Sequence, residues 1–151
     1  MSTTTEANKK VIERFNELLG VGDLEGAYAL TTEDLSWFSL SGRKTFGRQE
    51  LKEVTKWVLK AALREPVKLT TLETTAEDDR VAVMANGRAV TIDGVEYNNM
   101  YHMLYKFRDG KICAAWEFND TYYSRQTIRR GNDGELGLGE ALAGLSFSTK
   151  T

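Results

Sequence analysis

The chain has one cysteine and one histidine among its 151 residues. The single cysteine, Cys113, excludes an internal disulfide. One cysteine with one histidine is also too small a set for a zinc site of nitrogen and sulfur ligands. No metal site is therefore expected.

Long apolar runs and a strong charge of one sign are also missing. No segment approaches the length of a membrane span, and the first ten residues, MSTTTEANKK, contain no apolar signal core. The formal net charge is −2, and lysine and arginine are spread along the chain without a basic stripe. A membrane protein and a nucleic-acid-binding protein are therefore not expected, and the predicted location is the cytoplasm.

What is present is typical of a globular domain. Hydrophobic residues make up 41% of the chain and charged residues 28%, which is not the composition of a disordered protein. The length suits one domain with a sizeable core.

The first part of the chain has helical spacing. Apolar residues recur every three or four positions over residues 8–19, and Asp23 is placed to cap a second helix over residues 24–30. A third helix is predicted from about residue 47 to residue 64, and Pro66, the only proline, marks its end.

Beyond Pro66 the period changes to two. Four strands are predicted over residues 67–77, 80–92, 95–107 and 111–123, joined by tight turns, and a short strand is predicted over residues 35–40. The fold class is therefore α+β, with three N-terminal helices packed on one face of a curved antiparallel sheet. Residues 1–128 are expected to form this single domain, and residues 129–151 a glycine-rich tail that is flexible or packs on the domain or on a partner.

Three stretches resemble one known family. RFNELLGVGDLEGAYALTTEDLSWFSLSG is similar to the opening of the ketosteroid isomerases, and YNNMYHMLYKFRDGKICAAWEFNDT is similar to the last hairpin of SnoaL-like proteins. With FGRQEL, the likeness extends over about residues 8–128. The chain therefore resembles the SnoaL-like group of the nuclear-transport-factor-2-like superfamily, which implies a cone-shaped barrel and a small-molecule ligand.

The family's functional positions are only partly filled. The isomerases' tyrosine, general-base aspartate and second oxyanion donor correspond to Phe15, Ser39 and Met103. The resemblance therefore does not imply steroid isomerase chemistry of that kind.

Two further comparisons within the family leave candidates. The polar residues of limonene-epoxide hydrolase correspond to Asn86, Arg88 and Asp120, with one acid missing and the arginine displaced by two positions. The base of the SnoaL-like cyclases corresponds to Glu117, whereas their histidine corresponds to Met103 and not to His102.

The direction of the side chains depends on two turns. A two-residue turn at Asp93-Gly94 would set Arg88 across from Asn99 and Asn86 across from Tyr101. For the last hairpin, a two-residue turn would pair Glu117 with His102, and a three-residue turn would pair it with Tyr101. The three-residue form is preferred here, because it places Glu117 on the face of Asn86, Arg88, Asn99 and Tyr101. The opposite face then carries Met100, His102, Leu104, Trp116 and Phe118, and this apolar surface predicts a homodimer.

Each candidate has a functional and a structural interpretation. Glu117 is either a general acid/base tuned by Arg88 or half of a buried ion pair. Asp120 is either a further catalytic carboxylate or a solvated, turn-capping one. Asn86, Asn99 and Tyr101 either donate hydrogen bonds to a substrate oxygen or are satisfied polar groups of a water-filled barrel. The remaining expected ligand contacts are Trp37, Trp57, Tyr28 and Met103, of which the aromatics could equally be core residues.

The leading hypothesis is a cofactor-independent acid/base enzyme of the isomerase, cyclase, dehydratase or epoxide-hydrolase type, acting on a small apolar ring compound. The alternative is a non-catalytic module of the same fold that binds a small ligand or serves as a dimeric scaffold.

Overall fold

The structure is a computed structural model that describes residues 3–128. Its elements follow the chain in the order α1 (Thr3–Gly20), α2 (Leu24–Ala29), β1 (Thr31–Ser39), β2 (Lys44–Gly47), α3 (Arg48–Ala61), β3 (Lys68–Glu77), β4 (Arg80–Val90), β5 (Glu96–Arg108), β6 (Lys111–Asn119) and α4 (Thr121–Gln126). The predicted glycine-rich tail, residues 129–151, lies outside the described residues.

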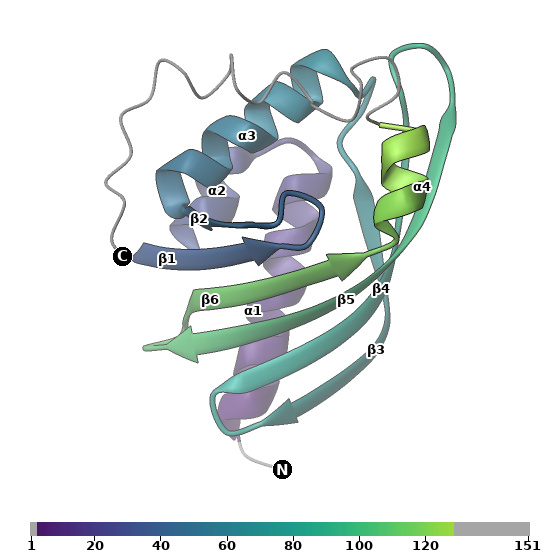
Figure 1. The fold of residues 1–151 in the computed structure, drawn as a ribbon. Coiled ribbons are helices and arrows are strands. Elements are labelled where there is room, and N and C mark those ends of the chain that lie inside the picture. The colour runs from purple at the N-terminus through teal and green to yellow at the C-terminus, as the bar shows by residue number, and fades with distance from the viewer. Residues whose placement is uncertain (1–2, 129–151) are drawn as a thin grey trace.

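The strands form one curved sheet in the order β2-β1-β6-β5-β4-β3. β1 runs parallel to β6, and every other neighbouring pair is antiparallel. The sheet is open, with β2 and β3 as its two edges (Figure 1). The predicted α+β class, with helices on a curved sheet, is confirmed.

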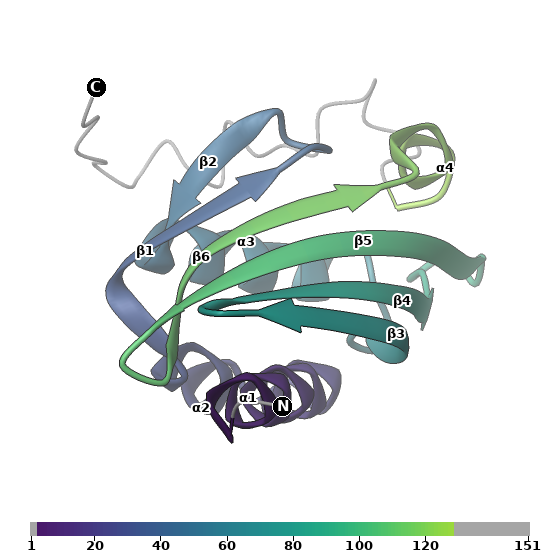
Figure 2. The ribbon, with the colours of Figure 1, turned by 90° about the horizontal axis from the view of Figure 1, so that it is seen from below.

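The longer helices lie on one side of this sheet, which is called the inner face below (Figure 2). α1 contacts β3 and β4, and α3 contacts β1. The stripe of Ile12, Phe15 and Leu18 on α1 is buried, because residues three or four apart point to the same side of a helix. Between helices and sheet lies one continuous apolar core.

The structure differs from the sequence prediction at both ends of the sheet. β2 was not predicted, and the last predicted strand, residues 111–123, ends at Asn119 and is followed by α4. The reason is local, because the Asp120 side chain accepts a hydrogen bond from the Tyr123 backbone N–H at 2.9 Å. Such a cap starts a helix in place of further strand pairing.

Two irregularities bend the long strands. Pairing between β3 and β4 shifts between Thr71 and Glu73, and pairing between β5 and β6 shifts between Lys106 and Phe107. The extra residues, Leu72 and Cys113, are therefore β-bulges, which increase the local twist of a strand. They help to curve the sheet around the helices.

The predicted register of the hairpin between β4 and β5 is wrong by one residue. Thr91 and Val95 face each other, with the Thr91 N–H donating to the Val95 carbonyl at 2.9 Å, so the loop has three residues and not two. The Thr91 side-chain oxygen also accepts from the Val95 N–H at 2.9 Å, which stabilises this longer loop. As a result Arg88 pairs with Asn98 and not with Asn99.

The last hairpin matches neither of the two predicted registers. Its turn has two residues, Asp109 and Gly110, both with positive φ, which is typical of a type I′ turn. The Cys113 bulge then shifts the pairing, so that Glu117 lies opposite Met103. The prediction that Glu117 shares a face with Tyr101 is nevertheless correct.

Among the described residues, no helix has both the length and the apolar character needed to span a membrane.

Candidate functional site

Two pockets lie between the helices and the inner face of the sheet, and they are called the two lobes of one cavity below because they share lining residues. The α1 lobe, of about 150 Å³, is lined mainly by apolar residues of α1, α3, β3 and β5. The α4 lobe, of about 250 Å³, carries more polar residues, including Ser39, Ser41, Asn119 and Ser124. The two lobes share Thr55, Val58, Val67, Tyr101 and Glu117. A ligand that fills both would therefore pass Tyr101 and Glu117.

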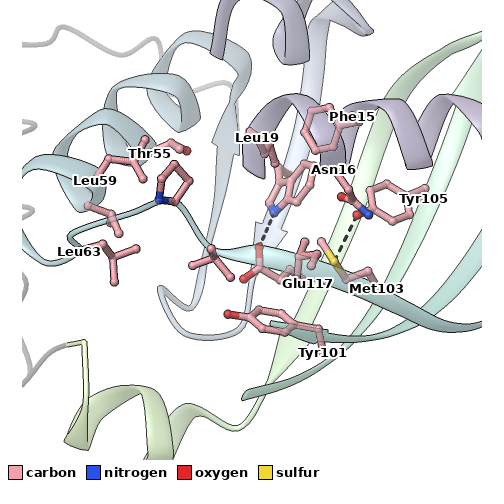
Figure 3. Close-up of a pocket in the computed structure, with 15 residues that line it drawn as sticks. Phe15, Asn16, Leu19, Thr55, Leu59, Leu63, Tyr101, Met103, Tyr105 and Glu117 are labelled. Atoms are coloured by element: carbon pink, nitrogen blue, oxygen red, sulfur yellow. Dashed lines mark hydrogen bonds between the residues drawn. The ribbon is translucent and has the colours of Figure 1, made fainter. Parts of the chain in front are cut away.

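Glu117 is the charged residue of this cavity. It is the one carboxylate among the described residues that line either lobe. It is half-buried on β6, and its Oε2 accepts a hydrogen bond from the Trp37 indole N–H at 3.0 Å. Asn119, two residues further along the strand, approaches Glu117 Oε1 with its amide nitrogen at 3.5 Å. In Figure 3 the Glu117 carboxylate and Tyr101 lie on one side of the pocket, and Thr55 and Leu59 of α3 lie on the other.

Trp37 orients Glu117 from a buried position on β1. Its ring lies 5.9 Å from that of Phe15 and 5.9 Å from that of Tyr105, between centroids. Only 4% of Trp37 is exposed. The indole N–H therefore has a fixed direction, and it needs an acceptor because a buried donor without one is costly.

The ring of Tyr101, on β5, lies next to Gly87 of the neighbouring strand β4, which has no side chain. A Cβ atom on Gly87 would stand 2.7 Å from Tyr101 Cε2. Glycine at this position therefore leaves room for the ring of Tyr101, which lines both lobes.

The tyrosines around Glu117 are held in the neutral form. Burial raises the pKa of Tyr101, and its proximity to Tyr97 and to Glu117 adds to the increase. Burial also raises the pKa of Tyr105 and of Tyr28, and the Glu117 charge contributes in both cases. These hydroxyl groups are therefore hydrogen-bond donors at neutral pH.

Arg88 and Asn86 are not in the cavity, contrary to the prediction. The register of β4 turns both side chains to the other side of the sheet, called the outer face below, where Arg88 is exposed. There the Arg88 Nε donates to Asn86 Oδ1 at 3.2 Å, and Asn86 donates to Asn98 Oδ1 at 2.6 Å. The predicted pairing of Arg88 with Glu117 is wrong.

Asp120 is exposed and caps α4, as the structural interpretation had it. It does not line either lobe. Its side chain and that of Glu117 therefore have different surroundings despite lying three residues apart.

Three other residues that were predicted to contact a ligand lie outside both lobes. The Asn99 amide donates to Tyr97, to Ser124 and to the Asp120 carbonyl, and does not reach either lobe. Tyr28 bonds to Thr55 behind the cavity, 3.0 Å between the hydroxyl oxygens, and Trp57 lines neither lobe. Met103 and Trp37 line the α1 lobe, and their contact with a ligand stays a prediction.

Sequence reasoning missed Tyr97, Asn119 and Ser124, which border the α4 lobe. Alternation along a strand could have identified two of them, because Tyr97 has the parity of Tyr101 and Asn119 that of Glu117. Ser124 could not be found in this way, because its position depends on the unpredicted helix α4.

Within residues 3–128, no group of three or more histidine, cysteine, aspartate or glutamate side chains is arranged to hold a metal ion.

Comparisons with known proteins agree with this architecture. The model of the SnoaL-like domain family matches residues 12–115. No curated protein matches the sequence significantly.

Solved structures of the same fold share little sequence with the chain. PrhC from Penicillium brasilianum is 20% identical, with a TM-score of 0.74 over 94% of this chain and 91% of its own. TerC, co-crystallised with polyporic acid, is 22% identical, with a TM-score of 0.72 over 82% of this chain and 98% of its own. An epoxide hydrolase of M. tuberculosis, similar to limonene-epoxide hydrolase, is 15% identical, with a TM-score of 0.69 over 84% and 92%. At these identities the likeness concerns the fold.

Proposed function

The chain belongs to the SnoaL-like family, and we propose that it is a cofactor-independent acid/base enzyme acting on a small, mostly apolar ring compound held in the cavity. One observation carries this proposal. Glu117 is the sole carboxylate among the described residues lining two otherwise uncharged lobes, and a fixed indole N–H orients it.

The reaction that suits this arrangement is removal of a proton from a carbon next to an oxygen-bearing carbon. Glu117 would accept the proton, and Trp37 would keep the carboxylate aimed at it. Tyr101, neutral and placed at the junction of the lobes, would donate a hydrogen bond to the substrate oxygen as negative charge develops there. Isomerisation, cyclisation and dehydration can each begin with this step.

Epoxide hydrolysis of the limonene type receives less support. In the resemblance to that enzyme, Arg88 and Asp120 supplied the second and third polar groups, and both are exposed outside the cavity. Glu117 alone remains, and one carboxylate is enough for proton transfer.

The test is a search for deuterium uptake. The protein would be incubated in D₂O with a panel of cyclic ketones and enones, and exchange at the carbon next to the carbonyl followed by NMR. We expect exchange with at least one compound, and we expect Glu117→Gln to lower its rate by about 10²–10⁴-fold while the fold stays intact. A Glu117→Gln variant with full exchange activity would rule out the assignment.

The alternative is a binding module, and the lining of the α1 lobe favours it. Phe15 and Met103 occupy family positions that carry polar groups in the isomerases and cyclases, and both line this lobe as apolar surface. A binding module would hold a panel compound without exchanging its protons, and Glu117→Gln would then change the dissociation constant only.

A homodimer through the outer face is also proposed. Exposed Met84, Met100, Trp116 and Phe118 lie on β4, β5 and β6, at 38%, 46%, 38% and 42% exposure. Pairing places Met84 opposite His102 and His102 opposite Phe118, so these side chains form one continuous patch. An apolar patch of this kind on a sheet suits a second copy of itself.

Sedimentation equilibrium tests the dimer. We expect Trp116→Lys to shift the protein toward monomer, because it places a charge inside the patch. Val21→Lys, on the exposed α1–α2 loop, is the matched control and should change nothing. A monomeric wild-type protein, or an unchanged Trp116→Lys dimer, would contradict the proposal.

A further inference from the structure

Asn16 is a polar residue on the buried side of α1, where it lines the α1 lobe. The residue is 8% exposed, and its side-chain oxygen is buried. Within residues 3–128, no group donates a hydrogen bond to this oxygen. Figure 3 shows Asn16 and Tyr105 on one side of the pocket and Leu63 on the other. A buried acceptor without a donor lowers stability, so its presence in the wall of a cavity calls for a reason.

The other polar side chains of the α1 lobe have hydrogen-bond partners within the protein. They are Trp37 and Glu117, which bond to each other, and Thr55, Tyr101 and Tyr105. The partner of Tyr105 is the weakest of these, because its hydroxyl donates to the Met103 sulfur at 3.2 Å and a thioether is a weak acceptor. Among the described residues of this lobe, the Asn16 oxygen is therefore the acceptor left for a ligand.

Asparagine is also unfavourable here for the helix itself. Residue 16 lies inside α1, and asparagine has a lower helix propensity than leucine or alanine. The sequence thus departs from two rules of stability at one position, the rule for helix interiors and the rule for buried polar groups. Departures of this kind are typical of residues that serve a ligand.

The size of the α1 lobe limits the group that can reach Asn16. Its volume is about 150 Å³, and an apolar cavity of that volume holds a molecule of the size of benzene. A plain ring would leave the Asn16 oxygen without a donor. A ring that carries a hydroxyl group would supply one.

We propose that the α1 lobe binds a hydroxyl-bearing ring, and that Asn16 is a specificity-determining residue whose side-chain oxygen accepts the hydrogen bond of this hydroxyl. The rest of a longer ligand extends past Glu117 into the α4 lobe, whose lining is more polar. The substrate class is therefore a phenol or a cyclic alcohol whose hydroxyl is remote from the carbon that Glu117 deprotonates. This inference rests on the proposed function for the identity of the substrate, but selective binding through Asn16 does not require turnover.

Binding of phenol and toluene tests the proposal, because the two probes differ by a hydroxyl in place of a methyl group. Their dissociation constants would be measured by NMR titration, following the indole N–H of Trp37, which lines the same lobe. The quantity compared between variants is the toluene constant divided by the phenol constant, in which the hydration of the free probes cancels. We expect Asn16→Leu to lower this ratio by about 2–10-fold, because one hydrogen bond to phenol is lost.

Two further variants support the comparison. Asn16→Ala, which cannot overfill the lobe, should lower the ratio as Asn16→Leu does. Asn8→Leu is the matched control, because Asn8 is an asparagine of the same helix, 3% exposed, that lines neither lobe. It should leave the ratio at the wild-type value. A wild-type ratio in Asn16→Leu and Asn16→Ala would overturn the proposal, since phenol would then donate to another group, such as Glu117.

Stability of the ligand-free protein gives a second readout, which separates a ligand-binding role from a structural one. We expect Asn16→Leu to raise the urea midpoint, because it removes an unsatisfied acceptor and a poor helix former. A lower midpoint would mean that the Asn16 amide has a structural role within the protein, and would contradict the proposal.

The two proposals can fail separately. If Asn16→Leu lowers the ratio while Glu117→Gln keeps full exchange activity, the choice of base is wrong and the hydroxyl site stands. If the ratio is unchanged in Asn16→Leu while Glu117→Gln is inactive, the hydroxyl site is wrong and the base stands.

Discussion

The inner and outer faces of the sheet use similar residues for different purposes. On β5, Asn99 is 2% exposed and donates to three acceptors, whereas its neighbour Asn98 is exposed. On β6, Glu117 faces the cavity, whereas Trp116 and Phe118 face outward. Residue type alone therefore does not mark the site. What marks it is the side of the sheet, and two loops and a bulge decide that side.

The largest change in stability is expected when the same charge is placed on adjacent residues of β4 that point to opposite faces. Val83 is 1% exposed on the inner face and Met84 is 38% exposed on the outer face. We expect Val83→Lys to cost about 3–5 kcal/mol, because it buries an uncompensated charge. Met84→Lys should change stability by no more than about 0.5 kcal/mol.

Both substitutions would be made in the Trp116→Lys variant, so that association does not contribute, and compared by urea unfolding. Equal losses at the two positions would mean that the faces are not distinguished as described.

Alkaline pH should act on the core through its buried tyrosines. Burial raises the folded-state pKa of Tyr28, Tyr101 and Tyr105. Above about pH 10 the unfolded chain therefore loses these protons first. Stability is fully present below that pH and falls above it, by about 1.4 kcal/mol per pH unit for each such tyrosine.

The measurement is the urea midpoint as a function of pH, together with tyrosinate absorbance. Tyr105→Phe should reduce the fall of the urea midpoint with pH by the contribution of one tyrosine. Ionisation of the inner tyrosines in the folded protein near pH 10 would contradict this expectation.

A smaller effect is expected at the contact between Trp37 and Glu117. Trp37→Phe removes the donor that lies 3.0 Å from Glu117 Oε2, and should cost about 1–3 kcal/mol. In a Glu117→Leu background the same substitution should cost less, because the acceptor is already gone. A double-mutant cycle measures this coupling. A coupling of zero would show that the indole N–H does not hold the carboxylate.

Much of the fold could be predicted, because it depends on the spacing of apolar residues and on the residues that end helices and strands. The apolar spacing around Phe15, the break at Pro66 and the alternation after it were sufficient to predict helices on a curved sheet. The parallel pairing of β1 with β6 was not predicted, because neither segment contains a signal for pairing with a strand so distant in the sequence.

The site was harder to predict, because single residues shift the register. The Thr91 side chain stabilises a three-residue loop, and this moved Arg88 and Asn86 to the outer face. The Cys113 bulge lies inside a strand, where no turn motif signals it. Glu117 was predicted to face the cavity and does so, but for a reason that the structure replaces: a bulge in the strand and not a longer turn.

Glu117 is proposed to act in the cavity, whereas Asp120, three residues away, caps a helix. The most direct measurement compares Glu117→Gln with Asp120→Asn in deuterium exchange of one ketone that the wild-type protein turns over. We expect a loss of about 10²–10⁴-fold for Glu117→Gln and a rate close to wild type for Asp120→Asn. Loss of activity in Asp120→Asn, with Glu117→Gln still active, would contradict it.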